Sequence, residues 1–163
     1  MNNSLSAGPV PHNLGSLPKL ELLYLGYNNL SGIVPPTIYN MSRMQKLDLK
    51  HNNFAGPIPN NQSFSLPLLQ VFDLSRNNFV GLIPSGLAAC KNLEIITLLD
   101  KHFVDVIPTW LAQLPRLFAL SLAKNNIVGS IPAVLSNPTH LTALDMAVNQ
   151  LTGLIPFFSW EFF

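Results

Sequence analysis

Few residues of this 163-residue chain have the types and spacing that metal binding or catalysis requires. The four histidines, His12, His51, His102 and His140, form no H-x-x-H or similar pattern, so they predict no metal site. The single cysteine, Cys90, stands where related segments of the chain carry an apolar residue, which favours a buried thiol over a reactive one. Neither a glycine-rich phosphate loop nor the G-x-S-x-G turn of serine hydrolases occurs. We therefore predict a protein that is not an enzyme and that uses no metal or cofactor.

The acidic residues that could act together are Asp48, Asp73 and Asp145, which occupy the same point of three similar segments. Paired carboxylates can perform general acid–base catalysis. The corresponding position of three other segments is not acidic, since it holds Tyr24, Thr97 and Ser121. A row interrupted in this way is better explained by a repeated segment than by a catalytic site.

The composition argues against several classes of partner. Hydrophobic residues make up 48% and charged residues 10% of the chain, and the formal net charge is +1. A nearly neutral chain predicts neither a nucleic-acid partner nor attraction to an anionic membrane surface. No apolar run approaches the ~20 residues that cross a bilayer, and the first residues lack the basic start and apolar stretch of a signal peptide. We expect no membrane contact by this segment itself.

An internal sequence repeat predicts the strands and turns on which these residues lie. An asparagine followed two places later by an apolar residue and four places later by glycine recurs about every two dozen residues. One degenerate unit has Lys101 in place of the asparagine and Asp105 in place of the glycine. The register divides the chain into a partial degenerate repeat (1–16), six repeats (17–40, 41–65, 66–89, 90–113, 114–137 and 138–156) and an off-register tail (157–163).

Each unit predicts one short strand and one turn limited by proline. Leu23 and Leu25 alternate with the outward-facing Leu22 and Tyr24, and a period of two is typical of a strand. A G-x-I/V-P segment closes the unit, and its proline rules out a long helix there. We expect the strands of successive units to stack as a parallel sheet.

The recurring asparagines have a structural explanation. At the end of a strand, an asparagine amide can pair with backbone groups that the neighbouring unit does not reach. A buried polar group without a partner costs about 1–3 kcal/mol, so an asparagine in each unit removes a repeated penalty. We predict a structural ladder, and not a row of binding residues, at Asn28, Asn52, Asn77, Asn125 and Asn149.

Segments such as LDLKHNNFAGPIP and LSLAKNNIVGSIP resemble the plant extracellular leucine-rich repeat, and the resemblance extends over residues 17–156. It implies an α/β solenoid, a right-handed superhelix with a parallel sheet on its concave face. It further implies a second short strand near each G-x-I-P segment, and short helical or irregular segments on the convex face. The role implied is recognition of a peptide or protein.

Arrays of this type resemble fragments of the ectodomains of plant leucine-rich repeat receptor-like kinases. The resemblance implies a ligand-sensing segment at the extracellular face of the plasma membrane, with a role in signalling or defence. It also implies a co-receptor as a possible partner and a Ser/Thr kinase domain elsewhere in the parent protein. Two alternatives stay open: a secreted leucine-rich repeat inhibitor of a cell-wall-degrading enzyme, and a truncated gene fragment without function.

Four N-x-S/T sequons, at Asn2, Asn29, Asn40 and Asn61, predict N-glycosylation. All four fall in segments expected to form turns or the convex side. Glycans at these positions would leave the inner sheet bare, which makes that sheet the expected binding surface.

The outward positions of the strands, and the residues directly after them, define the candidate binding residues. They combine large apolar groups with several cations, and aromatic and arginine side chains are enriched among binding hot spots. We predict that a ligand contacts Tyr24, Tyr27, Lys46, Lys50, His51, Val71, Arg76, Ile95, Leu99 and Asp100.

Overall fold

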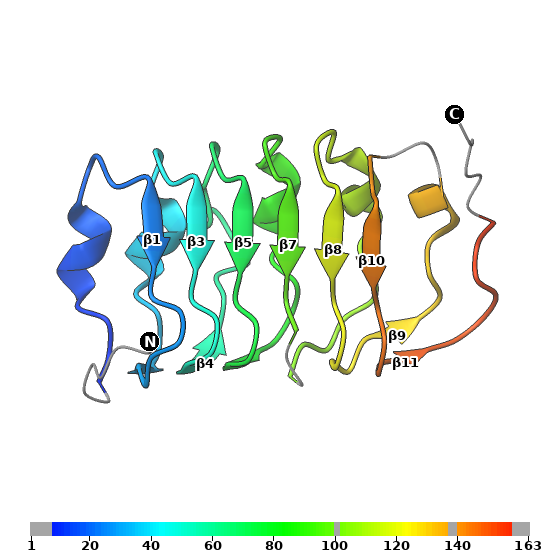
Figure 1. Cartoon of the computed structure of the whole chain (residues 1–163), viewed down its shortest axis with the longest axis horizontal. Helices are drawn as coiled ribbons and strands as arrows, with labels where there is room; N and C mark the ends of the chain where they lie inside the picture. The colour runs from blue at the N-terminus through cyan, green and yellow to red at the C-terminus, as the bar shows by residue number, and fades with distance from the viewer. Residues whose placement is uncertain (1–7, 100–101, 137–139, 158–163) are drawn as a thin grey trace.

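A computed structural model shows a single stack of coils, and the structure describes residues 8–99, 102–136 and 140–157 (Figure 1). Asn2, Asp100, Lys101 and the tail from residue 158 onward lie outside the described residues. One face of the stack is a six-stranded parallel sheet whose strands follow one another in chain order. The strands are β1 (Leu22–Tyr24), β3 (Lys46–Asp48), β5 (Val71–Asp73), β7 (Ile95–Thr97), β8 (Ala119–Ser121) and β10 (Ala143–Asp145).

The alternation of side chains explains why these segments are strands. The central residue of β3, β5 and β7 points into the coil, and Leu47, Phe72 and Ile96 are at most 1% exposed. Neighbouring strands pair in register, so Leu47 lies between Leu23 and Phe72. A continuous apolar column therefore runs through the stack, and each coil packs mainly on the coils directly beside it.

Short strands also form near the G-x-I-P segments. β2 (Ser31–Gly32), β4 (Asn53–Pro57) and β6 (Asn78–Val80) make one parallel sheet, and β9 (Val128–Gly129) and β11 (Gln150–Leu151) make another. The glycine of the repeat adopts a left-handed conformation here, as Gly56 does with φ of 88°. The structure thus contains the second short strand that the resemblance implies.

The fourth unit departs from this pattern at Asp105, which replaces the glycine. Isolated bridges take the place of a lateral strand at this point of the stack. The Asp105 carboxylate accepts hydrogen bonds from the backbone N–H groups of Ile83 (3.0 Å) and Val106 (2.8 Å). The side chain of Asp105 therefore links the third unit to the fourth, where the regular lateral strand is absent.

The convex side carries short 3-10 helices. They are η1 (His12–Ser16), η2 (Pro36–Asn40), η3 (Ser85–Ala89), η4 (Thr109–Gln113) and η5 (Ala133–Ser136). A proline stands directly before η2, η3 and η4, and its fixed φ suits the first residues of a tight turn. None of the described helices has the length and apolar character needed to cross a membrane.

Cys90 lies in the apolar column and is 1% exposed. Burial raises the pKa of its thiol to about 11. The Sγ atom lies 3.7 Å from the carbonyl oxygen of Gly86, to which it donates a weak hydrogen bond. Because the thiolate is the reactive form, a thiol with a raised pKa is suited to packing and not to nucleophilic chemistry.

The asparagines that follow the strands connect each coil to the preceding one. Asn52 Oδ1 accepts a hydrogen bond from Leu30 N–H at 3.0 Å. Its Nδ2 donates to the carbonyl oxygens of Leu25 (2.8 Å), Leu49 (3.0 Å) and Lys50 (3.2 Å). One side chain thereby satisfies backbone groups in two consecutive coils. The same pattern recurs at Asn77, Asn125 and Asn149.

We expect Asn52→Ala to lower the free energy of unfolding by about 3 kcal/mol, because buried backbone groups in two coils lose their partner. Asn28→Ala is the matched control. Asn28 Nδ2 donates only within its own coil, to Leu25 and Gly26, and its Oδ1 accepts no hydrogen bond from the described residues. This control should cost only about 1 kcal/mol. Urea denaturation measures both losses, and equal values would show that the bonds between coils add nothing.

In the sequence, Lys101 stands where the other units have the ladder asparagine, and this position lies outside the described residues. The N–H groups of Leu30, Phe54, Phe103 and Ile127 each donate to the asparagine of the following unit. For Phe79 the corresponding position is Lys101, whose ammonium group cannot accept a hydrogen bond. We expect Lys101→Asn to raise the free energy of unfolding by about 1 kcal/mol. A thermal melt tests this, with Lys91→Asn as an exposed control that should leave the midpoint unchanged.

Candidate ligand-binding surface

The outer side of the six-stranded sheet presents the first and third residues of each strand. The Cα register aligns Lys46, Val71 and Ile95 in one row across β3, β5 and β7, and all three side chains are half-buried. Tyr24 on β1 is more accessible, with 57% of its surface exposed. Because the strand backbones bond to one another within the sheet, a ligand on this face would contact mainly side chains.

Residues in the left-handed backbone conformation form a second row, just beyond the strands. They are Tyr27 (φ 58°), His51 (φ 53°), Arg76 (φ 55°), Lys124 (φ 57°) and Val148 (φ 58°). Residues other than glycine seldom adopt this conformation, but it allows the backbone ladder to continue: His51 N–H donates to the Ser75 carbonyl oxygen at 2.9 Å. Each of these residues is followed directly by a ladder asparagine. Three predicted ligand residues, Tyr27, His51 and Arg76, therefore share one edge of the sheet.

Two members of this row, together with neighbouring strand residues, form a compact cluster of side chains in the first three coils. The Tyr27 and His51 rings stack, with centroids 4.4 Å apart and planes at 17°. Lys50 Nζ lies 5.8 Å from the Tyr27 centroid, 2.7 Å from Asp48 Oδ2 and 3.5 Å from Asp73 Oδ2. The hydrogen bond that Lys50 donates to Asp48, together with the negative charges of Asp48 and Asp73, raises the pKa of Lys50 above its ordinary value. The two carboxylates thus compensate the Lys50 charge, and the predicted cations without an ion pair among the described residues are Lys46 and Arg76.

The aspartates of the strands have a backbone role as well. Asp48 Oδ1 accepts from Lys50 N–H at 3.2 Å, and Asp145 Oδ1 accepts from Ala147 N–H at 3.1 Å. Asp73 Oδ1 accepts from both the N–H (3.1 Å) and the Oγ (2.6 Å) of Ser75. Each carboxylate therefore closes the turn that ends its strand. These contacts give the aspartates a structural explanation that requires no catalytic role.

The other predicted positions are placed as follows. Leu99 is half-buried and lies two residues after β7, and its carbonyl oxygen accepts from Arg76 N–H at 2.8 Å. Asp100 lies outside the described residues. Among the residues that the structure describes, no group of three or more His, Cys, Asp or Glu side chains could hold a metal ion.

The described sequon asparagines are all exposed and lie away from the six-stranded sheet. Asn29 precedes β2, and its Oδ1 accepts from Asn53 Nδ2 at 2.6 Å. Asn40 ends η2 on the convex side. Asn61 lies on the loop before Phe64, where its Oδ1 accepts from Ser63 N–H at 2.9 Å. Glycosylation at these positions stays a prediction, and Asn2 lies outside the described residues.

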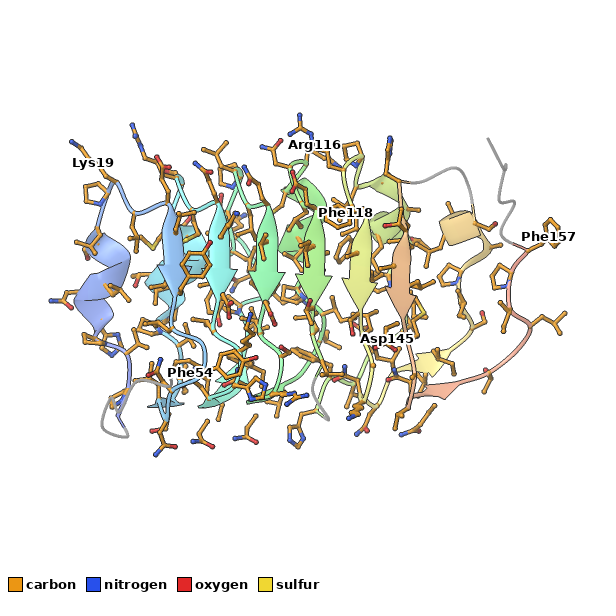
Figure 2. All side chains as sticks on the ribbon, viewed as in Figure 1. Lys19, Phe54, Arg116, Phe118, Asp145 and Phe157 are labelled. Atoms are coloured by element: carbon orange, nitrogen blue, oxygen red, sulfur yellow. The ribbon has the colours of Figure 1, made fainter. Side chains whose placement is uncertain are left out.

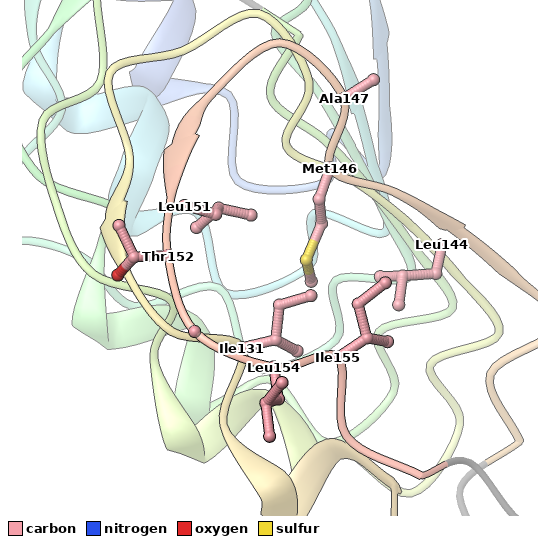
Figure 3. Close-up of a pocket in the computed structure, with 9 residues that line it drawn as sticks. Ile131, Leu144, Met146, Ala147, Leu151, Thr152, Leu154 and Ile155 are labelled. Atoms are coloured by element: carbon pink, nitrogen blue, oxygen red, sulfur yellow. The ribbon is translucent and has the colours of Figure 1, made fainter.

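A cavity of about 410 Å³ opens beside β10, at the last described coil (Figure 3). Its lining is apolar, and Figure 3 shows the side chains of Ile131, Met146 and Leu151 around it. Leu144 also lines the cavity and is 38% exposed, whereas its register partner Leu120 is 2% exposed. The cavity is therefore a continuation of the apolar column and not a separate site with convergent polar groups.

Comparison with known proteins decides the family. Leucine-rich repeat models match residues 10–54 and residues 68–90. The solved BIR2 ectodomain from Arabidopsis thaliana shares 34% sequence identity at a TM-score of 0.70, and the match covers 80% of this chain and 68% of that chain. The chain belongs to the leucine-rich repeat family. The solenoid with a parallel sheet, which the sequence resemblance implied, is thereby confirmed.

Longer plant receptors contain the same leucine-rich repeat architecture. The plant peptide hormone receptor RGFR1, solved in complex with RGF2, shares 35% identity at a TM-score of 0.86, over 92% of this chain and 24% of that chain. The Arabidopsis receptor kinase HAESA, solved with the peptide hormone IDA and the co-receptor SERK1, shares 31% identity at a TM-score of 0.86, over 96% of this chain and 26% of that chain. This chain thus spans about a quarter of those two chains. A comparison with curated proteins found no match.

Two features of this leucine-rich repeat surface could not be found from strand alternation. The compensation of Lys50 depends on Asp73, which belongs to the next coil. A further set of basic residues, including Lys19, Arg43 and Arg116, stands before the strands and not within them. In the sequence, these residues can be recognised because they stand three residues before an expected strand.

We expect Lys50→Met to lower the free energy of unfolding by about 1 kcal/mol, because Asp48 and Asp73 would face each other without their shared cation. The Lys50 side chain is 30% exposed, so salt screens the interaction. The difference from the parent chain should therefore shrink at ~1 M NaCl. Urea denaturation at low and high salt measures it. Lys46→Met is the control and should cost less, since Lys46 has no ion pair among the described residues.

Proposed function

We propose that this chain is a ligand-recognition segment of a plant membrane receptor ectodomain, and that it binds a peptide or protein on the six-stranded sheet. The observation that carries the proposal is the exposure of Tyr24, Tyr27 and Arg76, with the half-buried His51 stacked on Tyr27, on a sheet whose other outward residues are mostly small or half-buried. The solved relatives support it, because the peptide hormone receptor RGFR1 was determined in complex with RGF2, and HAESA in complex with the peptide hormone IDA and the co-receptor SERK1.

The residues of the cluster have different roles in this proposal. Tyr24 and Tyr27, which are 57% and 48% exposed, provide apolar area for anchoring. Lys46 and Arg76 attract acidic groups and influence the association rate. Lys50 instead supports the surface, since its ammonium group already binds Asp48 and Asp73 and contacts the face of the Tyr27 ring.

The size of the sheet limits the length of ligand that this segment can contact. Six strands spaced ~4.8 Å apart span ~24 Å, which corresponds to about seven residues of an extended peptide at ~3.3 Å each. A longer ligand would need additional coils. The proposal therefore concerns one part of a larger binding surface.

The cellular context is part of the same proposal. It places the chain at the extracellular face of the plasma membrane, with a co-receptor as a further partner and a Ser/Thr kinase domain in the parent protein. Glycans on Asn29, Asn40 and Asn61 are compatible with it, because these residues are exposed and lie away from the sheet face. Signalling, with defence among its outcomes, is the process that such a receptor would serve.

An alanine series tests the position of the binding surface. A library of short peptides is screened against the chain, and the affinity of each hit is measured by calorimetry. We expect Tyr24→Ala and Tyr27→Ala to weaken binding by about 2 kcal/mol each, because each removes an aromatic ring that the bound peptide would cover. Gln62→Ala, on the exposed convex loop, is the control and should have no effect. Equal losses from the convex and sheet-face substitutions would place the site elsewhere.

A further inference from the structure

A cavity of about 240 Å³ opens to the solvent at the first coil of the stack. It lies between the segments that follow η1 and η2, because residues 15–18 and Leu20 line it from the first segment and residues 40–43 line it from the second. Figure 2 shows the neighbouring Lys19 pointing away from the stack at this end, and Lys19 does not line the cavity. The cavity is therefore bordered by two consecutive coils and is accessible from outside.

The two helices that precede the cavity are packed against each other. Thr37 Oγ1 in η2 donates to the carbonyl oxygen of His12 in η1 at 3.5 Å. A Cβ atom added at Gly15 would collide with the Thr37 side chain, so the missing side chain of this glycine permits the contact. The segments that line the cavity therefore both begin at a close contact between neighbouring coils.

The lining of the cavity combines apolar and polar groups. Leu17 is 47% exposed, whereas Met41, the corresponding residue of the next unit, is 5% exposed. Pro18 is exposed as well, and so are Ser16 and Ser42, which add hydroxyl groups to the lining. A sugar ring has the same mixture, because its C–H groups form an apolar face and its hydroxyl groups form hydrogen bonds. At about 240 Å³ the cavity is smaller than the ~300–1,000 Å³ typical of sites for drug-sized ligands, so its size suits a single ring.

A glycosylation sequon lies at this cavity. Asn40, Met41 and Ser42 form the motif N-x-S, and all three residues line the cavity. Asn40 is exposed and ends η2. The other described sequon asparagines, Asn29 and Asn61, line neither this cavity nor the one beside β10. A glycan on Asn40 would thus be attached at a point from which its first sugar reaches the cavity.

We propose that Asn40 carries an N-linked glycan whose first N-acetylglucosamine packs in this cavity against Leu17 and Pro18 and stabilises the first two coils. In the modification, the Asn40 amide nitrogen replaces the diphosphate of a lipid-linked oligosaccharide at C1 of its first sugar, and one amide proton leaves with the lipid diphosphate. The inference rests on the extracellular location proposed above, because N-glycans are added in the secretory pathway. It does not depend on the peptide site, because η2 lies on the convex side of the solenoid.

The covalent bond to Asn40 determines which group occupies the cavity. Because the sugar is attached to a lining residue, its effective concentration at the cavity is high, and a weak contact is sufficient to hold it there. A sugar that packs on the folded chain but not on the unfolded chain stabilises the fold. The glycan on Asn40 should therefore raise the melting temperature, and this effect should depend on the exposed Leu17.

The test uses the whole chain, secreted behind an added signal peptide from a host that attaches high-mannose glycans. Mass spectrometry measures the occupancy of Asn29, Asn40 and Asn61, and an endoglycosidase then trims each glycan to its first N-acetylglucosamine. Thermal melts compare the trimmed parent, Asn40→Gln, Leu17→Ala and the double variant. The melts involve no peptide, so their outcome is independent of the alanine series that tests peptide binding.

We expect the trimmed parent to melt about 3 °C above Asn40→Gln, because the sugar is lost with the asparagine. In the Leu17→Ala background the same difference should fall below about 1 °C, since the ring lacks its apolar contact. Asn61→Gln is the matched control, because it removes one sugar from an exposed loop and should shift the midpoint by less than about 1 °C. The parent and Asn40→Gln made in bacteria carry no glycan and should melt within about 1 °C of each other.

Three results would overturn the inference. They are a secreted chain without a glycan on Asn40, equal midpoint shifts from Asn40→Gln and Asn61→Gln, and an Asn40→Gln shift that is unchanged in the Leu17→Ala background. The first would show that the sequon is not used, the second would show an effect common to any attached sugar, and the third would show that the sugar does not contact the cavity. A shift that is specific to Asn40 and depends on Leu17 supports it.

Discussion

The hydrogen bonds of Asn52 and its counterparts are the interaction on which the rest of the structure depends. A single coil is too small to bury its own apolar residues, so it is stable only when it packs on its neighbours. The asparagine makes that packing possible at the point where the strand ends, because it satisfies backbone groups of two coils in a dry environment. This turn holds the left-handed residue before the asparagine at the surface. It also keeps the preceding strand aligned with its neighbours in the six-stranded sheet.

Much of the fold could be predicted because its signals are local. The alternation around Leu23, the proline of each G-x-I/V-P segment and the recurring asparagine each identify an element within one unit. The sequence does not reveal which side chains of different coils contact one another. The stacking of Tyr27 on His51, the sharing of Lys50 by Asp48 and Asp73, and the bond from Ile83 N–H to Asp105 all depend on rotamers across a coil boundary. Repeat register places such residues near one another but does not show which of them pair.

The surface of the solenoid has sides of different chemistry. The sheet face combines exposed aromatic rings with charges that are partly compensated, whereas the edge before the strands holds cations that stay unpaired among the described residues. Lys50 and Arg43 have the same formal charge, yet of these two only Lys50 forms an ion pair with a described carboxylate. Net charge and composition therefore say little about what such an elongated molecule can bind, because they average over sides that do not share a partner.

The nearest-neighbour packing of the coils also affects how this architecture can change during evolution. Within the part of the chain that the structure describes, the six-stranded sheet is open at both ends and follows chain order from β1 to β10. Duplication or deletion of one regular unit would therefore keep the same kind of junction, because neighbouring regular coils pair in the same register. The fourth unit, which Asp105 links to the third, is the exception. The sheet would become longer or shorter by one strand while the remaining coils keep their contacts. Gene rearrangement can thus adjust the reach of the molecule in steps of one coil, independently of point mutations that alter its surface.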